Sequence, residues 1–170
     1  WASIGPDVSH TAYSAAKFAV KGFTEALIND LRLNAPHIKC SVVMPGHIGT
    51  SIVSNSRKVL SGTESDQLSP NEILQARQRL KSMGIDQAAM PDQQIQAIAA
   101  ERARSFRDEA PMTAAAAATV ILEGVKAGRW RILVGDDAHR LDERVRQTPE
   151  HAYDAEFYQS LAAEVGWRLG

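Results

Sequence analysis

A tyrosine and a lysine stand four residues apart near the start of the sequence, as Tyr13 and Lys17. On a helix this spacing places both side chains on one face, about one turn apart. A phenol with a pKa near 10 exchanges protons poorly at neutral pH, and a nearby cation stabilises its phenolate form. The pair is therefore a candidate for proton transfer at a reacting oxygen. An amphipathic helix whose lysine extends over a tyrosine is the structural alternative.

A second candidate segment is Pro45-Gly46-His47-Ile48-Gly49-Thr50, which directly follows an apolar run. Open α/β sheets bind their ligands at the carboxyl ends of the strands. Glycine lets a backbone come close to a ligand, and exposed N–H groups with the Thr50 hydroxyl can hold amide or phosphate oxygens. A strand-ending turn without a ligand is the alternative for Pro-Gly alone.

The elements that must position these residues follow from the spacing of apolar side chains. Helical spacing over 12–34 predicts a helix that carries Tyr13 and Lys17 and ends before Pro36. The run at 37–44 is typical of a strand buried on both faces, as in a parallel sheet. A second strand is expected over 129–135. Further helices are expected at 70–83, 91–107, 113–126, 137–145 and 152–164.

Local signals support some of the helix ends. Thr113 is a plausible N-cap of the helix that follows it, and Gly128 a plausible stop. The pair Asp136-Asp137, just after the second strand, is interpreted as the cap of the next helix. Cys40 lies in the buried strand and is expected to be a small core side chain rather than a nucleophile.

The order of elements predicts an α/β fold with βαβ units and a parallel sheet. Residues 51–111 are polar and rich in Ser, Gln and Arg, and we expect a helical insertion there. We interpret 1–170 as one partial Rossmann-type domain, with 51–111 as a substrate-binding or lid region and 136–170 as a helical tail.

The composition excludes several classes of protein. The chain is 44% hydrophobic and 23% charged with a formal net charge of −1, which is typical of a soluble globular fold. No broad basic field favours nucleic acid or an anionic membrane as a partner. One cysteine cannot form an internal disulfide, and the five histidines lack metal-ligand spacing, so no metal is expected. No apolar run approaches the roughly 20 residues of a membrane span, and we expect a cytoplasmic protein.

Both motifs, on this helix and after this strand, make the sequence resemble the short-chain dehydrogenase/reductase family. Its hallmark is Tyr-x-x-x-Lys at the start of a helix, followed one strand later by Pro-Gly-x-Ile/Val-x-Thr. The matching residues are Tyr13, Lys17, Pro45, Gly46, Ile48 and Thr50. The segment 13–27 looks like the family almost residue for residue, whereas the likeness is thin across 51–111 and in the tail.

The resemblance implies the C-terminal portion of a doubly wound, parallel-sheet, NAD(P)-binding Rossmann fold with a helical substrate-loop insertion. The implied activity is an NAD- or NADP-dependent interconversion of an alcohol and a ketone or aldehyde. Tyr13 would donate or accept the proton, and Lys17 would assist it and bind the nicotinamide ribose. The implied partners are a small-molecule alcohol or carbonyl substrate and, for the complete protein, further copies in a dimer or tetramer.

The implied cofactor contacts fall in the segment after the strand. The Ile48 backbone would contact the nicotinamide carboxamide, with Thr50 nearby and Pro45-Gly46 shaping the approach. Together with Tyr13 and Lys17 these residues form the predicted cofactor site.

Three family features are missing from the sequence. The glycine-rich dinucleotide fingerprint and the residue that selects NAD or NADP have no counterpart here. The catalytic serine of the family lies thirteen residues before the tyrosine, and Ser3 would fill its role only if a loop were shortened. The sequence begins at Trp1 without a methionine, so we expect it to be the carboxyl-terminal part of a larger enzyme. The alternative is a non-catalytic fragment or interaction module that lacks the dinucleotide-binding half.

Overall fold

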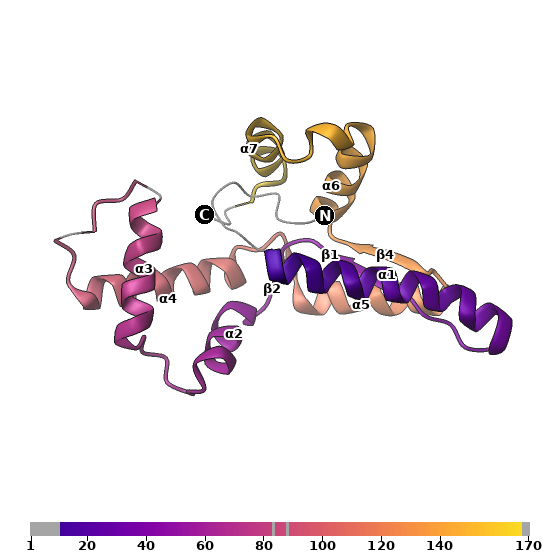
Figure 1. Cartoon of the computed structure of the whole chain (residues 1–170), viewed down its shortest axis with the longest axis horizontal. Coiled ribbons are helices and arrows are strands. Elements are labelled where there is room, and N and C mark those ends of the chain that lie inside the picture. The colour runs from indigo at the N-terminus through magenta and orange to yellow at the C-terminus, as the bar shows by residue number, and fades with distance from the viewer. Residues whose placement is uncertain (1–10, 83, 88, 168–170) are drawn as a thin grey trace. The chain divides into compact units, whose positions relative to one another are not determined.

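The computed structural model describes residues 11–82, 84–87 and 89–167 of the chain (Figure 1). They form a mixed α/β structure that is mostly helical and contains a parallel pair of strands. Among the described residues two compact units are present, one built from 11–48 and 111–167 and the other from the described part of 49–110.

The parallel pair joins two segments far apart in the sequence. Strand β1 (Val42–Pro45) pairs with β4 (Arg131–Val134), with Val42 opposite Arg131 and Pro45 opposite Val134. Both strands were predicted, but each is shorter than expected. Residues 35–38 form a turn closed by Ile38 N–H to the Ala35 carbonyl, so β1 begins later than residue 37.

Helix α1 (Thr11–Asn34) follows the predicted bounds and packs beside β1. Its end before Pro36 confirms the predicted stop, and Ser14 is the buried side chain among its residues. The apolar stripe expected to face a core is largely uncovered within the described chain. Phe23, for example, is 70% exposed. The strand that contacts α1 is β1, and one strand of four residues is too short to cover a helix of more than six turns.

Helix α5 (Ala114–Lys126) runs along the strand pair (Figure 1) and completes its core. The Thr113 hydroxyl accepts a hydrogen bond from the Ala116 N–H at 3.2 Å, which confirms the predicted N-cap. Gly128 adopts a left-handed φ of 67° just past the helix end, as its predicted role as a stop requires. The buried residues of this core are Ala117, Ile132 and Val134, with Val43, Ile48, Met112, Val120 and Ile121 packed against them.

A second, very short sheet lies next to this core. Strand β2 (Ile48–Gly49) pairs with β3 (Met112–Thr113), where the chain leaves and re-enters the unit that holds β1 and β4. Two-residue strands leave no periodic signal in a sequence, and neither was predicted.

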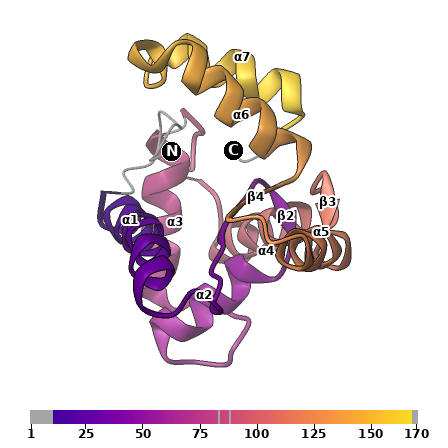
Figure 2. The ribbon, with the colours of Figure 1, turned by 90° about the vertical axis from the view of Figure 1, so that its right-hand side faces the viewer.

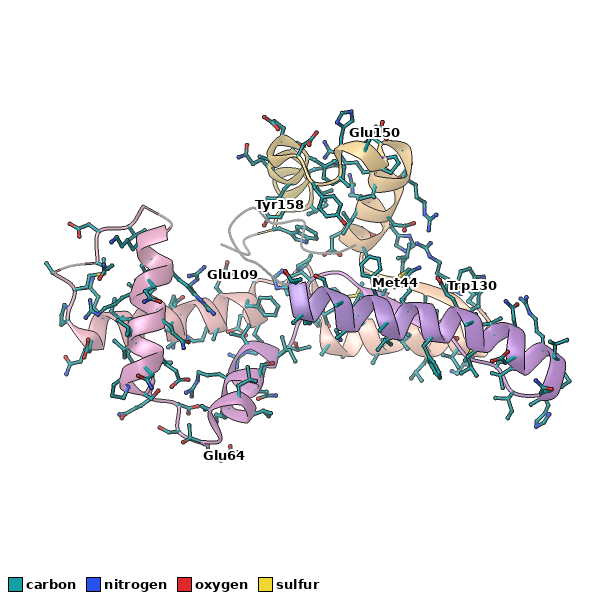
Figure 3. The ribbon with its side chains drawn as sticks, in the orientation of Figure 1. Met44, Glu64, Glu109, Trp130, Glu150 and Tyr158 are labelled. Atoms are coloured by element: carbon teal, nitrogen blue, oxygen red, sulfur yellow. The ribbon has the colours of Figure 1, made fainter. Side chains whose placement is uncertain are left out.

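The tail contains helix α6 (Asp136–Gln147), a 3-10 turn η1 (Pro149–His151) and helix α7 (Ala155–Val165). Helices α6 and α7 lie side by side in Figures 1 and 2 and share an apolar cluster. The cluster consists of Val145, Ala152, Phe157 and Leu161, with Leu141, Val165 and Trp167 against it. Tyr158 extends from α7 (Figure 3), and its ring centroid lies 6.4 Å from that of Trp167.

An ion group ties α6 to strand β4. The Asp142 carboxylate contacts the Arg131 guanidinium and accepts a hydrogen bond from Arg146 Nε at 3.0 Å. Burial raises the pKa of the Asp142 carboxyl, but the hydrogen bonds from Arg146 and Arg131 outweigh it and hold that pKa below its usual value.

The unit at 49–110 contains helices α2 (Ile52–Ser61), α3 (Pro70–Ser82) and α4 (Asp92–Asp108) around a small core of Ile73, Leu80 and Ile95. Helices α3 and α4 were predicted, whereas α2 was not. Helix α3 begins with a capping box, in which the Glu72 carboxylate accepts from the Ser69 N–H at 2.7 Å and the Ser69 hydroxyl faces the Glu72 N–H. Hydrogen bonds from the Ser69 backbone and hydroxyl lower the pKa of Glu72.

No helix among the described residues is long and apolar enough to cross a bilayer.

Candidate active site

The first turns of α1 bring Tyr13 and Lys17 together. The Lys17 ammonium lies 5.4 Å from the centroid of the Tyr13 ring, within the range of a cation–π contact. Tyr13 is 62% exposed and Lys17 is also exposed, so solvent or a ligand can reach both polar groups. The helix therefore presents a phenol and a cation as an exposed pair, and both are groups that can take part in acid–base chemistry.

The segment Pro45–Thr50 lies at the carboxyl end of β1, next to the end of β4. This is the edge of a parallel sheet at which ligands bind in open α/β folds. Pro45 is exposed, whereas Ile48 and Thr50 are half-buried. The cofactor contacts interpreted for this segment remain a prediction.

Two backbone N–H groups of this segment point into the protein. The Gly46 N–H donates to the Val134 carbonyl at 2.9 Å, and the His47 N–H donates to the Asp137 carboxylate at 2.6 Å. These donors hold the segment in place, and so they do not meet an incoming phosphate.

Asp137 is a residue that sequence reasoning missed. The N-cap position of α6 is Gly135 rather than Asp136 or Asp137, although Asp137 Oδ1 does accept from the Ala138 N–H in the first turn. The cap interpretation missed that the same carboxylate also bonds outside the helix. It is 3% exposed and reaches across to His47, ninety residues earlier in the chain. No local pattern signals a partner at that separation.

Three further predictions concern Cys40, Ser3 and metal ligands. Cys40 was expected in the buried strand, but β1 begins at Val42 and Cys40 is half-buried before it, with its sulfur 3.9 Å from the Thr24 carbonyl oxygen of α1. Ser3 lies outside the described residues. Among the residues that are described, no three His, Cys, Asp or Glu side chains gather as metal ligands.

A nicotinamide cofactor fits the described residues in part. Tyr13 and Lys17 are exposed, and a hydroxyl and an ammonium are groups that can hydrogen-bond to the hydroxyls of a ribose. The phosphate-binding turn that would hold the rest of the cofactor is not part of the sequence.

Comparison with known proteins bears directly on the site. A family model described as short chain dehydrogenase matches residues 2–60, the stretch that holds Tyr13, Lys17 and the segment after β1. The chain belongs to the short-chain dehydrogenase/reductase family. A protein named "Putative oxidoreductase SadH" from Mycobacterium tuberculosis, strain CDC 1551 / Oshkosh, is 31% identical over 136 residues, and so is its counterpart in strain ATCC 25618 / H37Rv.

These matches cover 80% of this chain but only 37% of each SadH protein. The chain therefore spans less than half the length of the curated relatives it matches. No solved structure matches the chain.

Proposed function

We propose that the complete protein is an NAD(P)-dependent oxidoreductase that interconverts an alcohol and a ketone or aldehyde. The single observation that carries this proposal is the Lys17 ammonium held over an exposed Tyr13, in a chain of the short-chain dehydrogenase/reductase family. The family match and the SadH relatives favour an oxidoreductase over a non-catalytic interaction module.

Tyr13 is the proposed proton donor and acceptor. In reduction its hydroxyl gives a proton to the carbonyl oxygen, and in oxidation its oxygen takes the proton from the alcohol hydroxyl. Lys17 stabilises the negative charge that the phenol oxygen carries between these steps, and its ammonium can also donate to ribose hydroxyls. A bound nicotinamide supplies the hydride or accepts it at the substrate carbon, so proton and hydride together balance the reaction.

The remaining proposed contacts lie beyond α1. The Ile48 backbone would meet the nicotinamide carboxamide, with Thr50 beside it and Pro45-Gly46 fixing the approach. The helical unit 49–110 would form the substrate-binding wall. The complete fold would be a doubly wound Rossmann sheet, of which β1 and β4 form a part, and a dimer or tetramer is the proposed assembly.

Tyr13→Phe in the complete protein tests the proton-transfer role. The substitution keeps the ring under Lys17 and removes only the hydroxyl, so turnover should fall by roughly 10²- to 10⁴-fold while cofactor binding by calorimetry stays close to normal. Tyr153→Phe is a matched control, because Tyr153 is 60% exposed and lies outside the site. Retained turnover in Tyr13→Phe would remove Tyr13 from the mechanism.

Loss of turnover in both tyrosine variants would indicate a general effect on the protein rather than proton transfer. A complete protein that neither binds nor uses NAD(H) or NADP(H) would refute the proposed function as a whole.

A further inference from the structure

A buried carboxylate with no part in the proposed chemistry lies behind the segment that follows β1. Asp137 Oδ2 accepts from the His47 N–H at 2.6 Å and from the Trp167 indole N–H at 2.8 Å. Oδ1 accepts from the Ala138 N–H at 2.9 Å. Three donors from three separate parts of the chain thus converge on one side chain that is 3% exposed.

The Asp137 carboxylate has room at this position because two residues next to it, Gly46 and Gly135, have no side chain. A Cβ added at Gly46 would come within 3.0 Å of both carboxylate oxygens and of Cγ, and a Cβ at Gly135 would come within 3.0 Å of Oδ1. Gly135 also adopts a φ of 101°, which favours glycine on its own account. The backbone on both sides is therefore shaped around the Asp137 side chain.

Burial of an ionised carboxylate is costly unless hydrogen bonds compensate it, so its donors are held firmly in place. One of these donors is the backbone of His47, directly before Ile48. Fixing the His47 N–H fixes the peptide plane between Gly46 and His47, and with it the direction in which the chain continues to Ile48. Asp137 thus acts on the segment through its backbone.

The Trp167 indole N–H connects Asp137 to the C-terminal tail. Trp167 packs against the cluster shared by α6 and α7 and lies 6.4 Å from the Tyr158 ring, and these contacts hold its indole N–H toward Asp137. The carboxylate, in the first turn of α6, therefore joins the segment after β1 to Trp167, just beyond α7.

We propose that Asp137 is a positioning residue, whose buried carboxylate fixes the Gly46–His47 backbone and so presents Ile48 and Thr50 to the nicotinamide end of the cofactor. This role rests on the proposed oxidoreductase function, whereas the anchoring of the segment is independent of it. Asp137 touches neither substrate nor cofactor, and it acts only through the peptide that it holds.

Amide hydrogen exchange on the complete protein tests the anchor without any activity. Asp137→Leu keeps the branched shape, with two bulkier methyl groups in place of the oxygens, but accepts no hydrogen bond, so exchange at residues 45–48 should become on the order of 10- to 100-fold faster. Exchange in α5 should stay unchanged, which shows that the variant is folded. Asp137→Asn keeps one oxygen for His47 and Trp167, and it should retain most of the protection.

Asp136→Leu is the matched control, because Asp136 is the exposed neighbour in the same first turn of α6. It removes an equal charge from the same place and should leave exchange at 45–48 unchanged. Unchanged exchange in Asp137→Leu, or an equal rise in Asp136→Leu, would overturn the anchor. Should Asp137→Leu fail to fold, Trp167→Phe, which removes one donor to the carboxylate, must raise exchange at 45–48 or the anchor is overturned.

Steady-state kinetics then test the positioning role. A misplaced nicotinamide contact should lower kcat on the order of 10- to 100-fold in Asp137→Leu, with a much smaller change in the cofactor KM, and Asp137→Asn should recover most of the loss. Faster exchange at 45–48 with unchanged kcat would overturn the positioning role. The two failures are distinct, because an unsubstituted protein without nicotinamide-dependent turnover refutes the proposed function, whatever the exchange data show.

Discussion

Replacing Gly46 with alanine should destabilise the unit that holds the parallel strands. The added Cβ would lie within 3.0 Å of three Asp137 atoms, whereas ordinary van der Waals contact falls at 3.4–4 Å. Those atoms are not the free end of a flexible side chain, since hydrogen bonds from His47 and Trp167 hold them. Either the carboxylate moves and loses these bonds, or the backbone of the segment shifts.

Both outcomes cost a similar amount. A hydrogen bond to a charged group contributes about 1.5–3 kcal/mol, and overpacking a filled interior costs about 1–3 kcal/mol. The clash can be removed by either movement alone, so the two costs do not add. We therefore expect Gly46→Ala to lower the free energy of unfolding by about 2–3 kcal/mol. That corresponds to a roughly 30- to 150-fold change in the folding equilibrium.

Urea unfolding followed by tryptophan fluorescence measures this loss. Trp130 and Trp167 both lie in the same unit as Gly46, so their emission reports its unfolding. The expected result is a lower midpoint with an unchanged m-value. A loss below about 0.5 kcal/mol, the size of an ordinary surface change, would refute the close approach of Asp137 to Gly46.

Two other glycines calibrate the result. A Cβ at Gly22, inside α1, meets nothing within 4 Å, so Gly22→Ala should raise stability by about 0.5–1 kcal/mol through helix propensity. A Cβ at Gly124 would lie 2.6 Å from Cδ1 and 2.8 Å from Cγ1 of the buried Ile132, a side chain with no hydrogen bonds to lose, and we expect a loss of about 1–2 kcal/mol. The predicted order is therefore Gly22→Ala, then Gly124→Ala, then Gly46→Ala as the least stable.

Two further measurements concern other contacts in the same unit. The folded-state pKa of Asp142 is lowered, so its contribution to stability is present above the ordinary carboxyl pKa and is lost as the pH falls through the lower folded value. Between about pH 5 and pH 2 the unsubstituted protein should lose more stability than Asp142→Asn, and parallel curves in urea titrations would contradict this. Thr113→Ala should lower the stability of α5 by about 1 kcal/mol, because the Ala116 N–H loses its acceptor, while Thr113→Ser should lose less than half of that. Equal midpoints for Thr113→Ala and the unsubstituted protein would show that the cap contributes nothing.

Elements with a local cause could be predicted from the sequence. Helix α1 follows from its apolar spacing and from Pro36, and α5 from Thr113 and its alanine run. Helix α2 could not be predicted in this way, since 52–61 mixes serines and β-branched residues and is held by contacts elsewhere. Among these, Arg57 donates to the Gln67 carbonyl at 3.3 Å and to Glu72.

In the candidate site, too, contacts between residues close in sequence could be predicted, whereas contacts between distant residues could not. Tyr13 and Lys17 are one helical turn apart, so their spacing alone predicts their contact. Gly46 was predicted to let the backbone come close to a ligand, and that remains a prediction. The sequence could not show that the Asp137 carboxylate, from a distant part of the chain, lies against Gly46. Asp137 sits where an acidic cap is common, and so its local context indicated a different role.

The short bridge between β2 and β3 has a consequence for how this fold can change. Ile48 and Met112 bring together the two points at which the chain departs for 49–110 and returns from it. With the ends already joined, the length of the intervening chain adds little to the entropy of closing the loop, because that cost grows only with the logarithm of loop length. The helical unit can thus lengthen, shorten or be exchanged for another without disturbing β1, β4 or the residues at their ends. Under the proposed function, substrate contacts and proton transfer would then be free to diverge separately.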